Sequence, residues 1–182
     1  MAQFEGAFTT DRLVLRPFRD SDAQKSFDLL NDIRVQPTII DGYIAPLKPK
    51  FIEDFKARVN KMVFFAVLET KDTSEWVGLT SLRSENPKNR DGFFGIVLRP
   101  EHWEKGIGTE VTKWMTDYAF QCLAMHRVSL EVFELNERAI DLYKRVGFVE
   151  EGRKREGNWV NGRWTDVISM GMLEEEWRAQ RS

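Results

Sequence analysis

Two glycines between a predicted strand and a predicted helix give this chain its clearest chemical signal. Gly106 and Gly108 stand in the segment Arg-Pro-Glu-His-Trp-Glu-Lys-Gly-Ile-Gly-Thr-Glu-Val-Thr, residues 99–112. The apolar residues that follow have the period of an amphipathic helix, which places both glycines at its N-terminus. There, unpaired backbone N–H groups and the helix dipole favour an anion, and glycine allows close approach. The segment predicts a phosphate-binding turn.

The neighbouring residues exclude two common phosphate loops. A Walker loop ends in Gly-Lys-Ser/Thr, whereas Gly108 is followed by Thr109 and Glu110. A dinucleotide fingerprint has a third glycine or an alanine where this chain has Val111. A bare Gly-x-Gly serves a tight turn more often than a ligand. The ligand must therefore be identified from another part of the sequence.

A second motif lies downstream, in residues 128–148. It follows the form Asn-x-x-Ala-x-x-Leu-Tyr-x-x-x-Gly-Phe, matched at Asn136, Ala139, Leu142, Tyr143, Gly147 and Phe148. Together with the glycine turn, it resembles the GNAT family of acetyl-CoA-dependent N-acetyltransferases. The resemblance extends over nearly the whole chain. It implies an α/β fold of the GNAT type, in which a mixed central sheet flanked by helices is splayed at the acetyl-CoA site.

The resemblance also implies acetyl-CoA as cosubstrate and no metal. Family members bind the pyrophosphate at an Arg/Gln-x-x-Gly-x-Gly/Ala turn. Here Trp103 replaces the Arg or Gln, and Glu104 brings a carboxylate whose charge Lys105 can offset. Carried over to this sequence, the cofactor-binding residues are Ile96, Val97, Leu98, Trp103, Glu104, Lys105, Gly106, Ile107, Gly108, Thr109, Asn136 and Tyr143.

Acetyl transfer to an amine needs a base for the ammonium proton, a donor for the oxyanion and an acid for the thiolate. Glu131 and Tyr143 lie five residues before and seven after Asn136. These positions match the base and the acid of relatives that acetylate N-terminal alanine, where the glutamate acts through water. We expect Glu131, directly or through water, as base and Tyr143 as acid. The oxyanion donor is expected to be a backbone N–H near Val97, where the family's cofactor-binding strand bulges.

Each of these residues also has a purely structural interpretation. Glu131 can be an exposed strand carboxylate or an ion-pair partner. Asn136 can serve only as a helix cap. Tyr143 can pack in the core, although a buried hydroxyl needs a polar partner. Trp159 and Trp164, the expected acceptor contacts, can instead pack on the sheet.

The resemblance narrows toward the branch that acetylates N-termini of ribosomal proteins. Residues 10–18, Trp103, the hairpin at residues 157–166 and Glu176-Trp177 carry this likeness. That branch also contains acetylases of polyamines, antibiotics and other small amines. We expect the acceptor to be a protein or peptide N-terminal amine. A small-molecule amine, or a non-catalytic acyl-CoA-binding module, is the alternative, and a homodimer is compatible with either.

Composition agrees with one compact enzyme. The chain has 182 residues, 42% of them hydrophobic, without a linker or repeat, so we expect a single domain over residues 1–182. Its 27 basic and 29 acidic residues argue against nucleic acid as a partner. Residues 1–8 lack signal-peptide features, and the longest apolar run, residues 62–68, is too short for a bilayer. We therefore predict a cytoplasmic protein that does not contact a membrane.

The single cysteine and the two histidines carry no predicted chemistry. Cys122 falls on the apolar face of the glycine-turn helix, so we expect a core residue. His102 and His126 lack metal-ligand spacing, and neither receives a catalytic role.

The elements that must position the site follow from periodicity and turn residues. Helices are predicted from about residue 21 to 30 and from 49 to 59, and these are expected to form one wall of the acceptor site. A further helix starts at the glycine turn, and another is capped by Asn136. Asn161-Gly162 predicts a tight hairpin. Strands are predicted at residues 13–18, 62–69, 77–83, 93–99 and 128–133.

Overall fold

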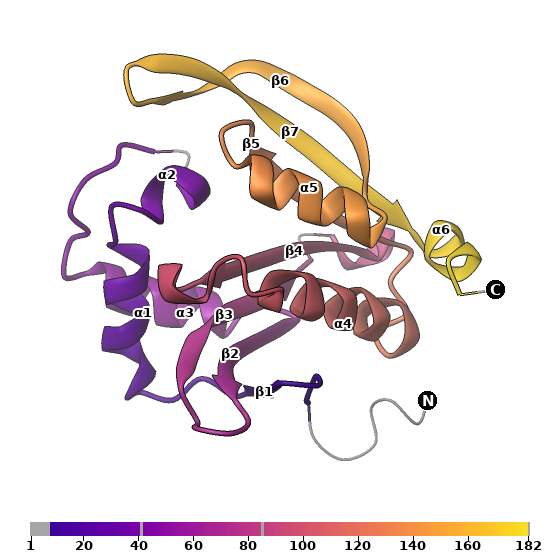
Figure 1. The fold of residues 1–182 in the computed structure, drawn as a ribbon, viewed down its shortest axis with the longest axis horizontal. Coiled ribbons are helices and arrows are strands. Elements are labelled where there is room, and N and C mark those ends of the chain that lie inside the picture. Colours follow the sequence, from indigo (N-terminus) through magenta and orange to yellow (C-terminus); the bar gives the residue numbers. More distant parts are fainter. Residues whose placement is uncertain (1–7, 41, 85, 182) are drawn as a thin grey trace.

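A seven-stranded mixed sheet with helices on both faces forms the protein (Figure 1). The computed structural model describes residues 8–40, 42–84 and 86–181. Residues 1–7, most of the segment read for a signal peptide, lie outside the described residues. The elements are β1 (Leu13–Arg16), α1 (Asp22–Leu30), α2 (Gln36–Ile39), α3 (Phe51–Val59), β2 (Phe64–Thr70), β3 (Trp76–Arg83), β4 (Asp91–Leu98), α4 (Ile107–Gln121), β5 (Arg127–Phe133), α5 (Glu137–Val146), β6 (Val149–Val160), β7 (Arg163–Leu173) and α6 (Glu174–Ala179), with short 3-10 turns η2 (Pro87–Asn89) and η3 (Pro100–His102).

The sheet has the strand order β1-β2-β3-β4-β5-β7-β6. Every neighbouring pair is antiparallel except β4 and β5, which run parallel. That parallel pairing joins residues 91–93 to residues 127–129 and goes no further. Beyond Phe93 and Ser129 the two strands diverge, so the predicted mixed and splayed sheet is confirmed.

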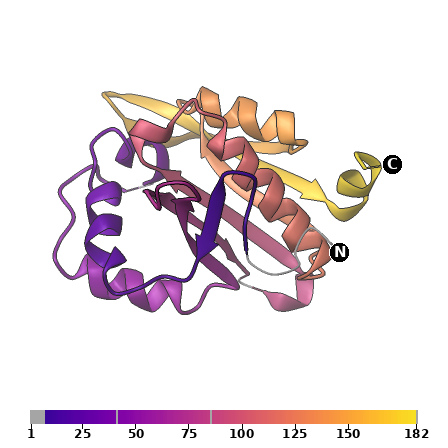
Figure 2. The same cartoon turned by 60° about the horizontal axis from the view of Figure 1, so that its bottom comes forward.

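The two faces of the sheet are covered by different helices. Side chains alternate along a strand, so Ala66 and Leu68 of β2 point to one face and Phe65 and Val67 to the other. The first pair packs in the core that includes α4 and α5, and the second packs with residues of α1 and α3. Figure 2 shows α4 lying along the sheet, with α1, α2 and α3 grouped at one side of the molecule.

The start of α4 is tied to the N-terminal edge strand. Glu110, in the first turn of α4, accepts hydrogen bonds from the Thr10 hydroxyl at 2.5 Å, the Arg12 backbone N–H at 2.9 Å and Arg12 Nε at 2.6 Å. Arg12 Nη1 also donates to the Lys105 carbonyl at 2.8 Å. These bonds fix the glycine turn against the segment that leads into β1, so the turn is held from outside the helix as well as from within.

The hairpin prediction is confirmed at its turn residues. Asn161 and Gly162 have φ values of 52° and 79°, which suits the two-residue turn between β6 and β7. The helices and strands predicted before the glycine turn are all present, with ends shifted by a few residues. The short helix α2 was not predicted, because Gln-Pro-Thr-Ile is too short to show a helical period.

The expected burial of Cys122 is wrong. Its side chain is exposed, because α4 ends at Gln121 and Cys122 is already the C-cap. Met125, three residues later, is buried instead. None of the described helices is long and apolar enough to cross a membrane.

We predict that Glu110→Gln destabilises the protein mainly at neutral pH. Burial raises the pKa of Glu110, but the hydrogen bonds from Thr10 and Arg12 outweigh it and lower that pKa overall. A carboxylate with a lowered pKa stabilises the fold above its usual titration range, and this contribution is lost as pH falls through the lowered value. Losing about 1–2 kcal/mol should lower the melting temperature by roughly 2–8 °C at pH 7.

The control is Glu174→Gln, which removes an exposed pair with Arg178 and should change the melting temperature much less. Thermal unfolding between pH 3 and pH 7 measures both variants. A Glu110→Gln difference that persists unchanged at the acid end would contradict the ionic explanation.

Candidate active site

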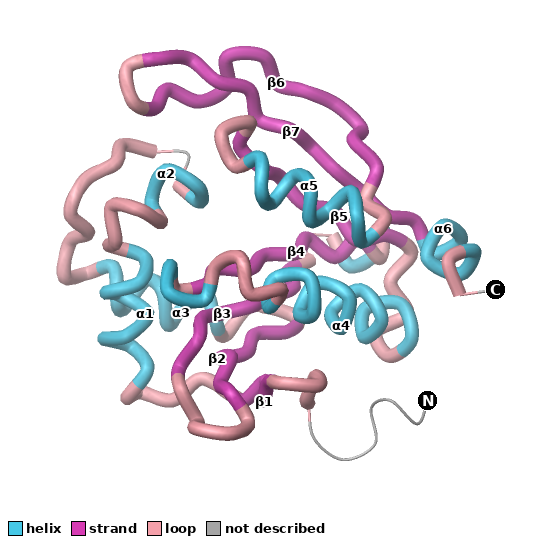
Figure 3. The backbone as a smooth tube through the Cα atoms, viewed as in Figure 1, coloured by secondary structure: helices cyan, strands magenta, loops and turns pink. Residues whose placement is uncertain are grey.

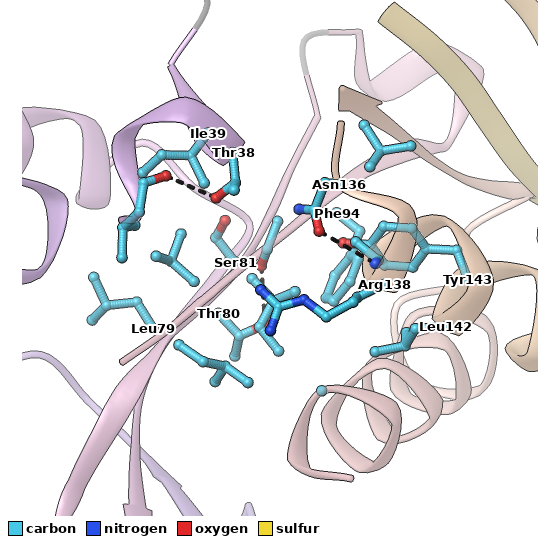
Figure 4. Close-up of a pocket in the computed structure, with 18 of the residues that line it drawn as sticks. Thr38, Ile39, Leu79, Thr80, Ser81, Phe94, Asn136, Arg138, Leu142 and Tyr143 are labelled. Atoms are coloured by element: carbon cyan, nitrogen blue, oxygen red, sulfur yellow. Dashed lines mark hydrogen bonds between the residues drawn. The ribbon is translucent and has the colours of Figure 1, made fainter. Parts of the chain in front are cut away.

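A pocket of about 700 Å³ opens where β4 and β5 diverge. It is lined by the glycine turn, by β4, by β5 and α5, and by residues of the N-terminal helices. Figure 4 shows Thr38 and Ile39 of α2 on one side and Asn136, Arg138 and Tyr143 on the other, with β3 and β4 between them. A pocket of this size suits a small ligand or part of a larger one.

The edge of β4 that faces this pocket lacks a strand partner from Phe94 to Leu98. The Arg99 N–H donates to the Val77 carbonyl on the β3 side at 2.9 Å. Since N–H groups of alternate residues point the same way, we expect those of Ile96 and Leu98 to face the gap instead. Unpaired backbone donors favour a ligand that supplies acceptors.

The bulge expected near Val97 does not appear as a register shift, because β3 and β4 pair without an inserted residue from Phe93 to Leu98. The irregularity is instead a close approach at Gly78. A Cβ there would lie 2.2 Å from the Val97 carbonyl oxygen and 2.9 Å from the Leu98 Cα. Only glycine permits this contact, so Gly78 shapes the backbone of β4 from the neighbouring strand.

The glycine turn has the backbone that its sequence predicts. Gly106 is the N-cap of α4 and has a φ of 75°, in the left-handed region. Gly108 lies against α5, where a Cβ would come 2.8 Å from the terminal methyl Leu142 Cδ1. The first glycine shapes the turn, and the second leaves room for this side chain.

Trp103, Glu104 and Arg138 form a group at the mouth of the pocket. The indole N–H of Trp103 donates to the Leu98 carbonyl at 2.9 Å, which ties the turn to the end of β4. The Arg138 guanidinium lies 4.4 Å from the centre of the Trp103 ring and pairs with Glu104 at 3.3 Å. The charge of Glu104 is therefore offset by Arg138 of α5, where the sequence had suggested Lys105.

Asn136 and Tyr143 reach the pocket from the two ends of one helix segment. Asn136 caps α5 as predicted, with its side-chain oxygen accepting from the Ala139 N–H at 3.3 Å, and its side-chain N–H₂ is not used by the cap. Tyr143 is buried, with its ring 6.4 Å from that of Phe94 and 5.8 Å from that of Phe148. Burial raises the pKa of Tyr143 to about 12, so its hydroxyl keeps its proton at neutral pH. No hydrogen bond joins that hydroxyl to another described residue.

Glu131 lines the pocket from the middle of β5. Its neighbours Leu130 and Val132 are buried, while the Glu131 side chain is exposed. Within the described part of the chain, the carboxylate has no ion pair or side-chain hydrogen bond. The carboxylate is therefore available to a ligand in the pocket. The structure offers no ion-pair partner for Glu131 among the described residues.

The structure brings most of the predicted site residues together but leaves four outside the pocket lining. Ile107 is buried in the core below the turn, and Lys105 is exposed. Trp159 and Trp164 form a cross-strand pair at the hairpin tip, with rings 5.1 Å apart and each side chain more than half exposed. Figure 1 shows this tip extending on the side of α2.

Sequence reasoning did not name the residues at the other end of the pocket. These come mainly from the N-terminal helices and β2, and include Leu30, Val35, Thr38, Ile39, Phe55 and Phe65. The helices α1 and α3, predicted to form one wall of the acceptor site, line the pocket through Leu30 and Phe55. The individual residues carried no signal, because they come from α1, α2, α3 and β2, which only the fold brings together (Figure 3). Within the described residues, no group of three or more His, Cys, Asp or Glu residues is arranged to hold a metal.

Residues 12–149 match the acetyltransferase (GNAT) domain. The chain belongs to the GNAT acetyltransferase family. The predicted class, an acyl-CoA-dependent N-acetyltransferase, is thereby confirmed at the level of the family.

Individual GNAT relatives agree on N-acetyl transfer but differ in acceptor. The chain is 37% identical over 101 residues to spermidine N(1)-acetyltransferase of Vibrio cholerae, covering 56% of this chain and 58% of that protein. It is 33% identical over 104 residues to a putative ribosomal N-acetyltransferase of Bacillus subtilis, covering 57% of each. In sequence the chain thus spans little more than half the length of these curated relatives.

A solved GNAT structure extends the likeness over the whole fold. The Vibrio cholerae spermidine N-acetyltransferase, crystallised with CoA and spermine, superposes with a TM-score of 0.78 at 27% identity. The match covers 91% of this chain and 98% of that one. It supports CoA as the cosubstrate of this fold.

We predict that the GNAT turn loses CoA affinity when Gly106 cannot keep its left-handed backbone. Gly106→Val places a β-branched residue at a φ of 75° and should weaken CoA binding at least tenfold. Gly106→Asn is the matched control, because asparagine tolerates this conformation and should bind more tightly than the valine variant. Calorimetric titration with CoA measures both. Equal affinity in Gly106→Val and the wild type would remove the turn from the binding site.

Proposed function

We propose that the protein transfers the acetyl group of acetyl-CoA to a primary amine in the gap between β4 and β5. The observation that carries the proposal is the convergence of three features on one pocket. These are the anion-binding turn at Gly106, the unpaired edge of β4, and the Glu131 and Tyr143 side chains of β5 and α5. No metal is needed for this chemistry.

The cosubstrate is proposed to bind by its two chemically distinct parts. The pyrophosphate meets the backbone N–H groups of the residue 106–109 turn. The pantetheine amides pair with the free edge of β4 around Ile96, Val97 and Leu98, as another strand would. Asn136 adds its side-chain N–H₂, because the cap uses only the oxygen.

The proposed reaction is a direct attack. Glu131 takes a proton from the ammonium, directly or through water, and the free amine then attacks the acetyl carbonyl carbon. A backbone N–H of β4 near Val97 donates to the oxyanion. The carbon–sulfur bond breaks, and Tyr143 donates its proton to the departing thiolate. The nitrogen gives up its second proton, which restores the Tyr143 hydroxyl directly or through water. The products are the acetamide, CoA with its thiol protonated, and one proton held by Glu131 until solvent takes it.

The acceptor is proposed to be the α-amine of a protein or peptide N-terminus, as in the ribosomal branch. In that case Trp159 and Trp164, which lie outside the pocket, contact the part of the peptide that extends beyond it. A polyamine is the second candidate, because spermidine N-acetyltransferases are among the relatives. Release of CoA thiol from acetyl-CoA, measured across peptides and small amines, tests the activity. A chain that binds acetyl-CoA and releases no CoA would be a non-catalytic module.

Replacing the proposed acid should slow turnover and leave cosubstrate binding intact. Tyr143→Phe keeps the ring contacts with Phe94 and Phe148 and removes only the hydroxyl. We expect turnover to fall by roughly ten- to a thousandfold with little change in CoA affinity. Tyr43→Phe, at an exposed tyrosine, is the control. Normal turnover in Tyr143→Phe would exclude Tyr143 from the mechanism.

Replacing the proposed base should lower turnover and leave cosubstrate binding intact. Glu131→Gln removes the proton acceptor and should reduce kcat by roughly a hundred- to ten-thousandfold, whereas Glu137→Gln, on the exposed face of α5, should not. Initial rates at saturating acetyl-CoA and calorimetric titration with CoA provide the comparison. Normal turnover in Glu131→Gln would show that another group is the base.

A further inference from the structure

We infer that the acceptor amine carries an apolar group, aromatic or branched aliphatic, next to its nitrogen, and that polycations are poor acceptors. This inference rests on the proposed acetyl transfer. It comes from the part of the pocket that the N-terminal helices and β2 form, which we call the acceptor chamber. The chamber is formed by Leu30, Val35, Thr38, Ile39, Phe55 and Phe65.

The chamber is apolar and only partly filled by its own side chains. Val35 and Phe55 are buried, whereas Ile39 and Phe65 are half-buried although they face the pocket. The rings of Phe55 and Phe65 meet edge to face with centres 5.9 Å apart. An apolar substituent that enters the chamber would cover the exposed parts of Ile39 and Phe65 and would itself become buried, and both changes favour binding.

Two hydroxyl groups near the chamber, those of Thr38 and Thr80, already have partners for their protons, whereas Ser81 of β3 also lines the pocket. Thr38 donates to the Val35 carbonyl at 2.7 Å, drawn as a dashed line in Figure 4, and Thr80 donates to the Gly95 carbonyl at 3.1 Å. These bonds are local to the fold. The chamber therefore offers little polar recognition to a substrate.

Negative charge is scarce on the chamber side of the pocket. Among the described lining residues, the carboxylates are Glu104, Glu131 and Asp141, and none of them comes from the N-terminal helices. The nearby Asp22 and Asp32 are paired with Arg16 at 2.7 Å and Arg34 at 2.6 Å. Asp41 lies outside the described residues.

The charge pattern matches an acceptor with one ammonium group. Glu131 can face that single positive charge at the point of transfer. A second ammonium placed among Phe55 and Phe65 would lose its hydration without a carboxylate in return. Attraction of a cation to a phenylalanine ring is weaker than that loss. A linear polyamine is thus disfavoured, whereas an amine with one apolar arm fits both parts of the site.

The test compares acceptors at saturating acetyl-CoA. The amines are 2-phenylethylamine, L-phenylalaninamide and spermidine, and the readout is kcat/KM for CoA-thiol release. We expect each apolar amine to exceed spermidine at least tenfold, the size of effect that one pocket-filling group produces. A spermidine kcat/KM equal to or above those of both apolar amines would overturn the inference.

Two variants at one position test the cause of the preference. Thr38→Asp adds a carboxylate to the chamber, and Thr38→Asn changes the shape in the same way without the charge. The ratio of the kcat/KM for spermidine to that for 2-phenylethylamine should be at least tenfold higher in Thr38→Asp than in Thr38→Asn. An equal ratio in the two variants would overturn the charge argument.

The inference and the activity it rests on fail in different ways. If no amine releases CoA while calorimetry shows that acetyl-CoA binds, the proposed acetyl transfer is wrong and the inference falls with it. If CoA is released fastest with spermidine, acetyl transfer stands and only the apolar acceptor is wrong.

Discussion

The divergence of β4 from β5 is the constraint on which the site depends. Two parallel strands that pair over residues 91–93 and 127–129 and then separate leave backbone donors and acceptors of β4 without a partner. Such groups are costly unless water or a ligand satisfies them. Here the gap lies beside the N-terminus of α4, so a ligand in it meets free strand-edge amides and helix-end amides at the same place.

Packing on both sides keeps the gap open. Tyr143 of α5 packs against the rings of Phe94 and Phe148. Its ring therefore blocks a closer approach of β4 to β5. Gly108 leaves room for Leu142 of α5, and Gly78 lets β3 approach β4 at Val97. The pair of Arg138 with Glu104, stacked on Trp103, joins α5 to the turn across the mouth of the pocket. Most of the residues that shape the gap thus also line it, with Gly78 and Phe148 as the exceptions.

The sequence predicts local features well and contacts across the sheet poorly. Asn136 and Asn161-Gly162 act through their immediate neighbours, so the helix cap and the hairpin could be recognised from a few residues. Glu104 pairs with Arg138 because α4 and α5 pack together, and no local sequence pattern predicts this packing. Gly78 is required by a carbonyl on the adjacent strand, and Cys122 is exposed because α4 ends one residue earlier than the apolar period suggested. The acceptor end of the pocket is assembled from four separate segments, so its apolar character became visible only in the fold.

The central claim is that CoA binds along the free edge of β4 and at the start of α4. Residue-resolved hydrogen exchange, recorded with and without saturating CoA, tests it most directly. The account predicts slower exchange on CoA addition for the β4 amides that face the gap, Ile96 and Leu98, and for residues 106–109, with β1 and β2 unchanged. Protection confined to other parts of the sheet, with β4 and the glycine turn unaffected, would contradict it.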